Sequence, residues 1–382
     1  MRIGIDAHAI GGQLTGNETY VKNLIVALTE IDQENEYVLF FTHADLARQW
    51  QERLPRVRVH LIRPHTPYAR IPFSFPLAIY RTGIDLLHVQ YTAPPWSPKP
   101  VVTTIHDLSY EHFPQFFTPR ERFFFKRTIP HTARKAVKVL TGSEYSRHDL
   151  IRTYSLPPEK VVVTPYGVAE QFQPVRDHER LATVRRRYGI ERPYLLTVGN
   201  LQPRKNLARL IQAYTQARSS DEGFRCQLVI VGKKAWLHQH IFHEAHRSHY
   251  AGDVILTDYV PDEDLPVLYS GAVAFVYPSI FEGFGLPVLE AMACGTPVVT
   301  SNSSSLPEVV GSAGLMVDPY DTDALANALA RIVEDEALRL RLSEEGRRRA
   351  ARFTWRRTAE LTLGVYYEVL GLSAPRKASS KV

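Results

Sequence analysis

Residues 272–290 read AVAFVYPSIFEGFGLPVLE, and this stretch decides the expected fold. The apolar run Ala272–Tyr277 predicts a short buried strand, and a loop with two glycines follows it. The segment then becomes an apolar helix, with Glu290 about two turns into it. A buried strand that leads through a loop into a helix is typical of a parallel sheet covered by helices on both faces.

The same order of strand and helix recurs along most of the chain. Strands are expected at Arg2–Ala7, Tyr37–Phe41, Leu86–Val89, Val101–Ile105, Lys138–Thr141 and Val161–Thr164, and then at Tyr194–Val198, Gln227–Val231, Val254–Thr257, Ala272–Tyr277 and Pro297–Thr300. A polar, arginine-rich break around Gly167–Pro193 separates the two series. The sequence therefore predicts an α/β protein with two doubly wound parallel-sheet domains.

Length and composition agree with this expectation. At roughly 150 residues per domain, 382 residues predict two or three domains. The hydrophobic content of 44% and charged content of 23% exclude a disordered or collagen-like chain. Two cysteines cannot form a disulfide framework, so we expect buried free thiols, a cytoplasmic location, no signal peptide and no membrane-spanning helix. The net charge of +6 suits anionic partners without choosing among them.

Ligands of such sheets bind outside the carboxyl ends of the strands, so the residues that follow strands are informative. The strand Tyr194–Val198 leads through Gly199 and Asn200 to Arg204 and Lys205, just before a helix. Two adjacent cations after a glycine turn can hold a diphosphate, because arginine offers a planar fork and lysine a point charge. The alternative is a solvated pair of charges.

Glu282 and Glu290 follow the strand Ala272–Tyr277 at a spacing of eight residues, with Gly283 and Gly285 between them. The glycines allow backbone N–H groups to face an anion, and the two carboxylates can hold different hydroxyls of one polyhydroxylated ligand. A buried carboxylate without a partner would be costly, so each glutamate is expected to have one.

Two further segments follow strands in the first half. His106 comes directly after the strand Val101–Ile105, and its position indicates either a ligand contact or a structural histidine. Gly11, Gly12 and Gly16 follow the first strand and predict either a loop that approaches the ligand or a polar surface loop. Their spacing is not that of a dinucleotide-binding fingerprint.

Taken together, these motifs resemble those of the retaining nucleotide-sugar glycosyltransferases of family 4, which have the GT-B fold. The likeness runs from residue 1 to about 370. Within the family, the sequence is most similar to those of mannosyltransferases of polysaccharide and O-antigen assembly. The resemblance implies two Rossmann-like domains that face a central cleft. Residues 1–170, with a C-terminal helix at about 358–382, would form the acceptor-side domain, and residues 171–357 the donor-binding domain.

The resemblance also implies roles for individual residues. Arg204 and Lys205 match the pair that binds the donor diphosphate, Glu282 the glutamate at the sugar hydroxyls, and His106 the histidine near the transferred sugar. The residues expected to bind the donor are Gly12, Gly199, Asn200, Val231, Tyr259, Val260, Phe284, Gly285, Leu286 and Glu290, with Glu290 at the ribose. Glu18 departs from the family, which more often has a basic residue in this loop.

The implied reaction is the transfer of a hexose to a glycan or lipid-linked acceptor with retention of the anomeric configuration. Mannose from GDP-mannose is the favoured donor, and neither a metal nor a cofactor is expected. The alternatives are a UDP-sugar donor and a GT-B subunit that binds without catalysis. A phosphorylase would need a pyridoxal-phosphate lysine that we cannot identify, and a nicotinamide enzyme lacks its fingerprint here. Nucleic acid is not an expected partner.

Residues 120–138 carry seven Lys or Arg and one acidic residue, together with Phe123, Phe124 and Phe125. A basic helix with an aromatic face can lie on an anionic bilayer, which indicates peripheral contact with the inner membrane surface. The alternative is a solvated helix whose phenylalanines pack into the first domain. Pro130 favours that alternative, because a proline is expected to interrupt the helix.

Overall fold

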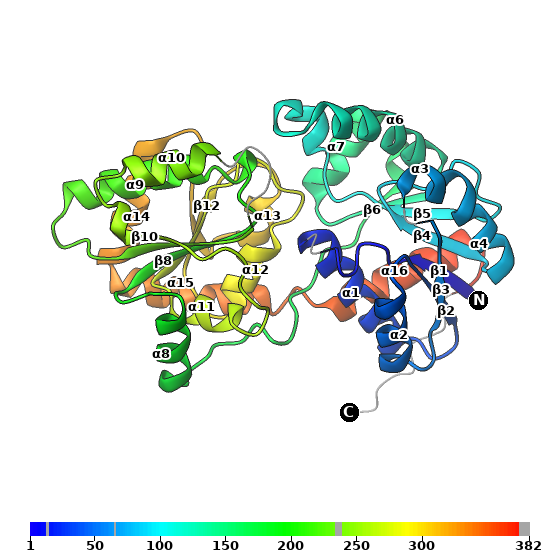
Figure 1. Cartoon of the computed structure of the whole chain (residues 1–382), viewed down its shortest axis with the longest axis horizontal. Helices are drawn as coiled ribbons and strands as arrows, with labels where there is room; N and C mark the ends of the chain where they lie inside the picture. Colours follow the sequence, from blue (N-terminus) through cyan, green and yellow to red (C-terminus); the bar gives the residue numbers. More distant parts are fainter. Residues whose placement is uncertain (13–14, 65, 234–238, 374–382) are drawn as a thin grey trace. The chain divides into compact units, whose positions relative to one another are not determined.

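The computed structural model describes residues 1–12, 15–64, 66–233 and 239–373 (Figure 1). The chain divides into two compact units, each with its own parallel sheet. Unit 1 comprises Met1–Glu111, Pro119–Tyr166 and the chain from Trp355 onward, whereas unit 2 comprises His112–Thr118 and Gly167–Thr354. The prediction of two parallel-sheet α/β domains is confirmed.

Unit 1 contains a seven-stranded sheet in the order β3-β2-β1-β4-β5-β6-β7, and neighbouring strands run parallel. Its strands are β1 (Arg2–Asp6), β2 (Glu36–Phe41), β3 (Arg58–Leu61), β4 (Leu86–Gln90), β5 (Val101–Thr104), β6 (Lys138–Thr141) and β7 (Val161–Val163). The sequence analysis missed β3, which lies at the edge of the sheet and has no fully buried residue. Its polar residues remove the apolar run that reveals a central strand.

The helices of unit 1 cover both faces of this sheet. They are α1 (Thr15–Ile31), α2 (Ala44–Arg53), α3 (Pro67–Ala69), the π-helical turn η1 (Arg70–Ser74), α4 (Phe75–Thr82), α5 (Ser109–His112), α6 (Pro119–Lys135), α7 (Glu144–Tyr154), the 3-10 turn η3 (Pro158–Lys160) and α16 (Trp355–Val369). Figure 1 shows α1, α2 and α16 on one side of the sheet and α6 and α7 on the other. The sheet is therefore a buried middle layer.

The last described helix, α16, completes unit 1. It packs along α1, and the hydroxyl of Tyr366 lies 2.6 Å from Nδ1 of His88 on β4. The hydroxyl of Thr358 donates to the backbone oxygen of Pro165 over 2.6 Å. Residues far apart in the sequence thus share one core.

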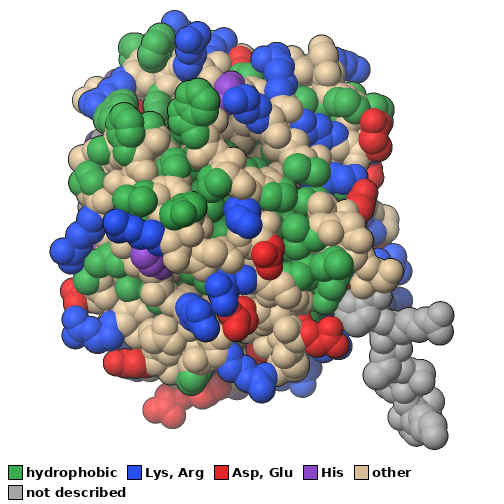
Figure 2. All heavy atoms as spheres, turned by 90° about the vertical axis from the view of Figure 1, so that its right-hand side faces the viewer, with side chains coloured by type: hydrophobic (Ala, Val, Ile, Leu, Met, Phe, Trp, Pro, Cys, Tyr) green, Lys and Arg blue, Asp and Glu red, His purple; other side chains and the backbone are tan. Residues whose placement is uncertain are grey.

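Helix α6 runs without a break through Pro130, so the predicted interruption is wrong. A proline removes one backbone hydrogen bond, but buried Ile129, Thr132 and Ala133 anchor the helix beside it. Phe123 is 76% exposed, whereas Phe124 is half-buried. Figure 2 views the side of the molecule on which α3, α4 and α6 lie, and Lys or Arg and hydrophobic side chains share its upper part.

Unit 2 contains a six-stranded sheet in the order β10-β9-β8-β11-β12-β13, again with parallel neighbours. Its strands are β8 (Tyr194–Val198), β9 (Gln227–Val231), β10 (Val254–Leu256), β11 (Ala274–Tyr277), β12 (Val298–Ser301) and β13 (Gly314–Val317). The strand β13 was not predicted, and like β3 it is a partly exposed edge strand.

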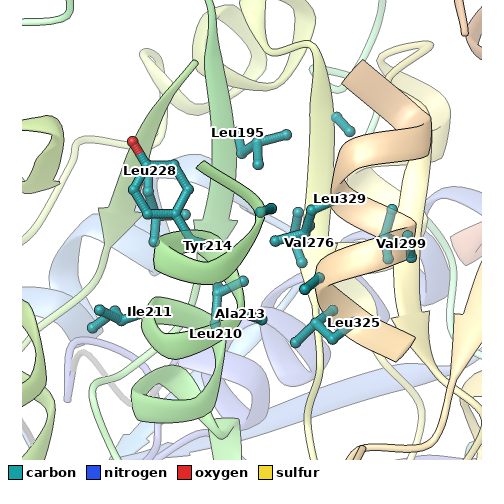
Figure 3. Close-up of a cluster of buried hydrophobic side chains, with 14 of the residues drawn as sticks. Leu195, Leu210, Ile211, Ala213, Tyr214, Leu228, Val276, Val299, Leu325 and Leu329 are labelled. Atoms are coloured by element: carbon teal, nitrogen blue, oxygen red, sulfur yellow. The ribbon is translucent and has the colours of Figure 1, made fainter. Parts of the chain in front are cut away.

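Helices cover both faces of the unit 2 sheet as well. They are α8 (His178–Arg187), α9 (Leu207–Ser220), α10 (Gln239–Arg247), α11 (Leu265–Gly271), α12 (Leu286–Ala293), α13 (Leu306–Val310), α14 (Thr322–Glu334) and α15 (Glu336–Ala350), with the short turns η2 (Pro114–Phe116), η4 (Pro203–Lys205) and η5 (Ala251–Asp253). Figure 3 shows the core beneath α9 and α14, where Leu210, Tyr214 and Leu329 meet Leu195 and Val276 of the sheet. This packing fixes the positions of the strand ends.

Both cysteines, Cys226 and Cys294, are buried free thiols, as predicted. Over the described residues, no helix combines the length and the apolar character that a bilayer crossing requires.

Candidate functional site

Three charged side chains meet at the carboxyl ends of β8 and β11. Glu282 pairs with Arg204 over 2.9 Å through one carboxylate oxygen and with Lys205 over 2.7 Å through the other. Burial alone would raise the pKa of Glu282, but the charges of Arg204 and Lys205 outweigh it and lower the pKa to about 2. The glutamate is therefore ionised at neutral pH, and the cluster of Arg204, Lys205 and Glu282 carries one net positive charge.

Sequence reasoning missed two side chains that hold this cluster. The hydroxyl of Tyr277, the last residue of β11, accepts a hydrogen bond from Lys205, whose Nζ lies 4.8 Å from the centre of the ring. The hydroxyl of Ser279 donates to a carboxylate oxygen of Glu282 over 2.5 Å. Tyr277 is the last residue of a strand and Ser279 comes two residues later, and this position at a strand end was the sequence signal that could have identified them.

A serine run after β12 fixes the backbone around Glu282. The N–H of Glu282 donates to the hydroxyl of Ser304 over 2.9 Å, and the hydroxyl of Ser305 donates to the Glu282 carbonyl over 2.8 Å. The hydroxyl of Ser303 donates to the carbonyl of Ile280 over 3.0 Å. These bonds hold the Glu282 loop rigid, and the run of serines directly after a strand could have revealed them.

Asn206 joins the Arg204 segment to neighbouring loops. It has a left-handed backbone conformation with φ of 59°, and its side-chain amide donates to the carbonyls of Pro278 (3.1 Å) and Pro319 (2.6 Å). Asparagine tolerates this conformation better than most residues. The bend places Arg204 and Lys205 at the start of α9, beside the loop after β11.

The loops after β8 and β9 touch through their backbones. A Cβ atom at Gly232 would lie 1.9 Å from the carbonyl oxygen of Gly199, so only glycine fits there. The Gly199 N–H donates to the Val231 carbonyl over 2.8 Å, and the Lys205 side chain passes close beside Gly199. Gly199 and Val231, both predicted site residues, thus lie next to the charged cluster, and Asn200 follows Gly199 directly.

The loop after β10 adds an exposed aromatic ring. Tyr259 is 52% exposed, and Nζ of Lys233 lies 4.5 Å from the centre of its ring. The next residue, Val260, is buried, and the Asp258 carbonyl accepts from the Gly232 N–H over 2.9 Å. The structure thus brings the predicted Tyr259 and Val260 to the loop of Gly232.

Helix α12 begins with the glycine loop of the opening sequence. Gly285 has a φ of 106°, and a Cβ atom there would come within 2.7 Å of Leu306. Phe284 is buried with its ring centre 5.8 Å from that of Phe353, and Leu286 is the first helical residue. Glycine is therefore required for the chain to enter α12 beside Glu282.

Glu290, on α12, differs from Glu282 in its partners. The Tyr269 hydroxyl donates to its carboxylate over 3.1 Å. Burial raises the pKa of Glu290 to about 7, and the negative charge of Asp262 adds to this effect. Both glutamates thus have the partners that their apolar surroundings required, and near neutral pH Glu290 exists in both protonation states.

The segment His112–Thr118 belongs to unit 2 although it lies between α5 and α6 in the sequence. The ring centres of His112 and Phe113 lie 5.6 Å and 5.5 Å from that of Phe281, the residue before Glu282. The sequence analysis missed this contact, since nothing local in the segment indicates that it leaves unit 1.

The other two predicted site residues, His106 and Gly12, lie in unit 1. Nε2 of His106 lies 2.7 Å from the Gln90 side-chain oxygen, and its Nδ1 lies 2.5 Å from the Tyr166 hydroxyl. An amide oxygen only accepts, so Nε2 carries the proton and Nδ1 accepts from Tyr166. Burial lowers the pKa of His106 to about 4, so the ring is neutral. Gly12 is exposed.

Glu18 has a local role in this loop. Its carboxylate accepts a hydrogen bond from the Gly11 N–H over 2.9 Å. Glu18 thus closes the glycine loop onto the start of α1.

Comparison with known proteins identifies the family. Residues 183–349 match the family described as glycosyl transferases group 1, and residues 14–172 match glycosyltransferase family 4. The chain is 36% identical over 266 residues to the O-antigen chain mannosyltransferase B of Escherichia coli, an alignment that covers 69% of each protein. The chain belongs to glycosyltransferase family 4. This family 4 glycosyltransferase is also 28% identical over 255 residues to the E. coli serotype-specific mannosyltransferase WbdA; that alignment covers 66% of the chain but 31% of WbdA.

Solved structures show the fold of this family 4 glycosyltransferase. Sucrose-phosphate synthase from Thermosynechococcus elongatus has a TM-score of 0.78 at 23% identity, covering 98% of this chain and 100% of its own. The Anabaena protein HepE in complex with UDP-glucose has a TM-score of 0.77 at 18% identity, covering 96% and 100%. The family 4 glycosyltransferase thus has the GT-B fold.

Proposed function

We propose that this glycosyltransferase transfers mannose from GDP-mannose to a glycan or lipid-linked acceptor, with retention of configuration and without a metal ion. The observation that carries the proposal is the cluster of Arg204, Lys205 and Glu282 at the strand ends of unit 2. The two E. coli relatives are both named as mannosyltransferases, and the name of one refers to the O-antigen chain, which supports mannose as the sugar and an acceptor in O-antigen assembly.

Arg204 and Lys205 bind the donor diphosphate and stabilise it as it leaves. Glu282 neutralises one of their two charges, so the cluster retains an excess positive charge for an anion. Both cations are preorganised and largely buried, with side chains 14% and 11% exposed, so they interact strongly with developing negative charge. This stabilisation is the role a divalent cation has in other transferases.

The two glutamates bind different hydroxyl groups of the donor. Glu282 is ionised and held by two cations, so it accepts hydrogen bonds from sugar hydroxyls and cannot serve as a general acid. Glu290, with its pKa raised to about 7, binds the ribose hydroxyls. A carboxylate neutralised by two cations is a poor nucleophile, which favours departure and attack on one face of the sugar over a covalent intermediate.

The remaining predicted residues surround the donor. Lys233 and the exposed ring of Tyr259 bind the base, and the Val231 and Gly199 loops support it from the backbone. The first N–H groups of α12 face the phosphates or the sugar. In unit 1, His106 positions the transferred sugar as a neutral ring, and Gly12 approaches the donor through its backbone.

We also propose peripheral contact with an anionic membrane through residues 120–138. Exposed Phe123 lies between exposed Arg122 and Lys126 on α6, and these residues line a hollow of about 420 Å³. Cations near an anionic surface add about 1 kcal/mol each, and an aromatic side chain inserts at the interface. Continuity of α6 through Pro130 supports one extended basic face.

The test of the reaction is a panel of GDP-mannose, UDP-glucose and ADP-glucose, with released nucleotide measured in the presence of EDTA. We expect turnover with GDP-mannose alone, unaffected by EDTA, and NMR of the product should show the α-anomer of the donor. Preference for UDP-glucose would identify the alternative donor. Absence of turnover and of nucleotide binding would leave the chain as a binding subunit, and loss with EDTA would contradict the metal-free reaction.

Membrane contact is tested by flotation with anionic and neutral liposomes at low and high salt. We expect binding to anionic liposomes at low salt, because the attraction is screened within about 10 Å at 0.1 M. Phe123→Ala should weaken it, whereas Tyr320→Ala, an exposed aromatic residue of unit 2, should not. Equal binding to both lipids, or to neither, would contradict the proposal.

A further inference from the structure

Arg70 is the first residue of the π-helical turn η1, and only 5% of it is exposed. Its Nε atom is buried without a hydrogen-bond partner. Across the described ranges 1–12, 15–64, 66–233 and 239–373, its guanidinium forms neither a hydrogen bond nor an ion pair. A buried guanidinium N–H without a partner is unfavourable, so this arrangement requires an explanation.

Packing places Arg70 at the carboxyl end of β1. Asp6, the last residue of β1, is in register with Phe40 of β2, so both side chains point to the same face of the sheet. The ring of Phe40 packs on Phe75, the first residue of α4, with centres 5.1 Å apart. Since η1 leads directly into Phe75, Arg70 lies on this face at the edge where ligands of such sheets bind.

The nearby carboxylate of Asp6 is already occupied by His8. One oxygen accepts from the His8 N–H over 3.1 Å, and the other lies 2.9 Å from its Nδ1. Burial alone would raise the pKa of Asp6, but His8 and, to a smaller extent, the positive charge of Arg70 lower it. Arg70 therefore influences Asp6 through space without using its donors, while the His8 side chain remains 31% exposed beside it.

We propose that Arg70 and His8 form a second anion site, in unit 1, that binds a phosphate group of the acceptor. The planar guanidinium fork matches two phosphate oxygens, and the outer nitrogen of His8 offers a third contact. The proposal rests on the proposed function, which assigns the donor diphosphate to Arg204 and Lys205 and so leaves this site to the acceptor.

The same segment points to a phosphate that is carried on a lipid. Phe73, three residues after Arg70 in η1, is 73% exposed, and Leu77 and Tyr80 continue the exposed apolar positions along α4 at 47% and 78%. An apolar chain attached to the phosphate could lie along these side chains, which free phosphate would not contact.

Calorimetric titration of the full chain with inorganic pyrophosphate tests the site. We expect two binding events in the wild type. Arg70→Gln should lose one of them, weakened at least about 10-fold by the loss of charge-assisted hydrogen bonds, and Lys205→Ala should lose the other. Arg81→Gln, an exposed arginine on α4, should retain both.

The outcomes separate this site from the proposed function. GDP should bind Arg70→Gln as it binds the wild type, and failure of GDP to bind the wild type would instead contradict the proposed function. Arg70→Lys keeps the charge beside Asp6 but not the fork and should also weaken pyrophosphate binding. Two unchanged binding events in both variants would overturn the site. Unfolding of both variants by circular dichroism would also overturn it, because the side chain would then serve the fold alone.

The source of the phosphate is distinguished by farnesyl diphosphate. Tighter binding of farnesyl diphosphate than of pyrophosphate, lost in Arg70→Gln and reduced in Phe73→Ala, would support a lipid-linked group. Equal affinity, still dependent on Arg70, would support a free phosphate group.

Discussion

Two groups of buried polar side chains, one in each unit, differ in charge. In unit 2, Arg204, Lys205 and Glu282 form a charged cluster at the ends of β8 and β11. In unit 1, His88 and His106 at β4 and β5 are neutral rings, each held between hydroxyl or amide groups. The same topology therefore supports two different electrostatic environments.

The difference in charge follows from the effect of burial on each side chain. Burial lowers the pKa of both histidines, to about 3 at His88 and about 4 at His106, so their partners need not neutralise a charge. Glu282 remains ionised under similar burial only because two cations face it. The charged cluster at the ends of β8 and β11 can bind an anion, whereas the neutral rings of His88 and His106 hold the hydroxyl groups of Tyr366 and Tyr166 in place.

The largest effect should come from removing α16. Deleting the chain from Thr358 removes buried Ala359, Val365 and Tyr366 and exposes the face of α1. We expect unit 1 to lose cooperative unfolding while unit 2 retains it, measured by calorimetry and proteolysis. A chain that ends at Ser373 is the control, and a truncated protein that melts like this control would contradict the packing.

Lys205→Ala should have the next largest effect. It removes a preorganised cation from the leaving diphosphate, so turnover should fall about 10²- to 10³-fold in a folded protein. Arg247→Ala, an exposed arginine on α10, is the control. Turnover of Lys205→Ala within about threefold of the control would contradict the proposal that Lys205 stabilises the leaving diphosphate.

Glu282→Gln and Glu290→Gln should change the pH dependence of stability in opposite directions. The pKa of Glu282 lies below its ordinary 4.5, so its stabilisation is present above pH 4.5 and is lost as pH falls toward 2. The pKa of Glu290 is raised to about 7, so its contribution is present below pH 4.5 and is lost as pH rises through 7.

Urea unfolding from pH 3 to pH 8 measures both effects. Glu282→Gln should flatten the acid limb of the wild-type curve, and Glu290→Gln should abolish the loss between pH 4.5 and 7. If both variants altered the same limb, the environments assigned to the two carboxyl groups would be wrong.

The smallest effect should come from the hydrogen bonds of the neutral histidine His88 in unit 1. Tyr366→Phe leaves Nδ1 of His88 without its hydrogen bond and should lower the free energy of unfolding by about 1–3 kcal/mol. Nucleotide binding should not change. Weaker GDP binding in this variant would mean that the network of unit 1 serves more than the fold.

The sequence predicted the central strands and two of the four edge strands, β7 and β10, but missed β3 and β13. Apolar runs such as Ala272–Tyr277 reveal a strand because both of its faces are buried. Strand β3 was missed because Arg58 and His60 interrupt its apolar residues, and β13 is apolar but begins with Gly314, a residue that is unfavourable in strands. The continuity of α6 was also missed, since the cost of Pro130 is local but the packing that offsets it is not.

The site was predictable as a set of residue types but not as a network. Arg204, Lys205 and Glu282 stood out because charges directly follow strands, yet the sequence could not show that all three form one ion-paired cluster. Tyr277 and Asn206 were missed because their roles depend on loops brought together by the sheet. Arg70 gave no signal at all, as burial of an arginine is a property of the folded unit.

The position of α16 in the chain affects the order of folding. Unit 2 is continuous from Gly167 to Thr354 apart from one short segment, and most of its contacts can form while the chain is still being synthesised. Unit 1 needs α16 against α1, a pairing of segments more than 300 residues apart. Such distant contacts form slowly. The apolar face of α1 therefore stays exposed to solvent until α16 has been synthesised. A chaperone that shields this face would raise the yield of folded enzyme.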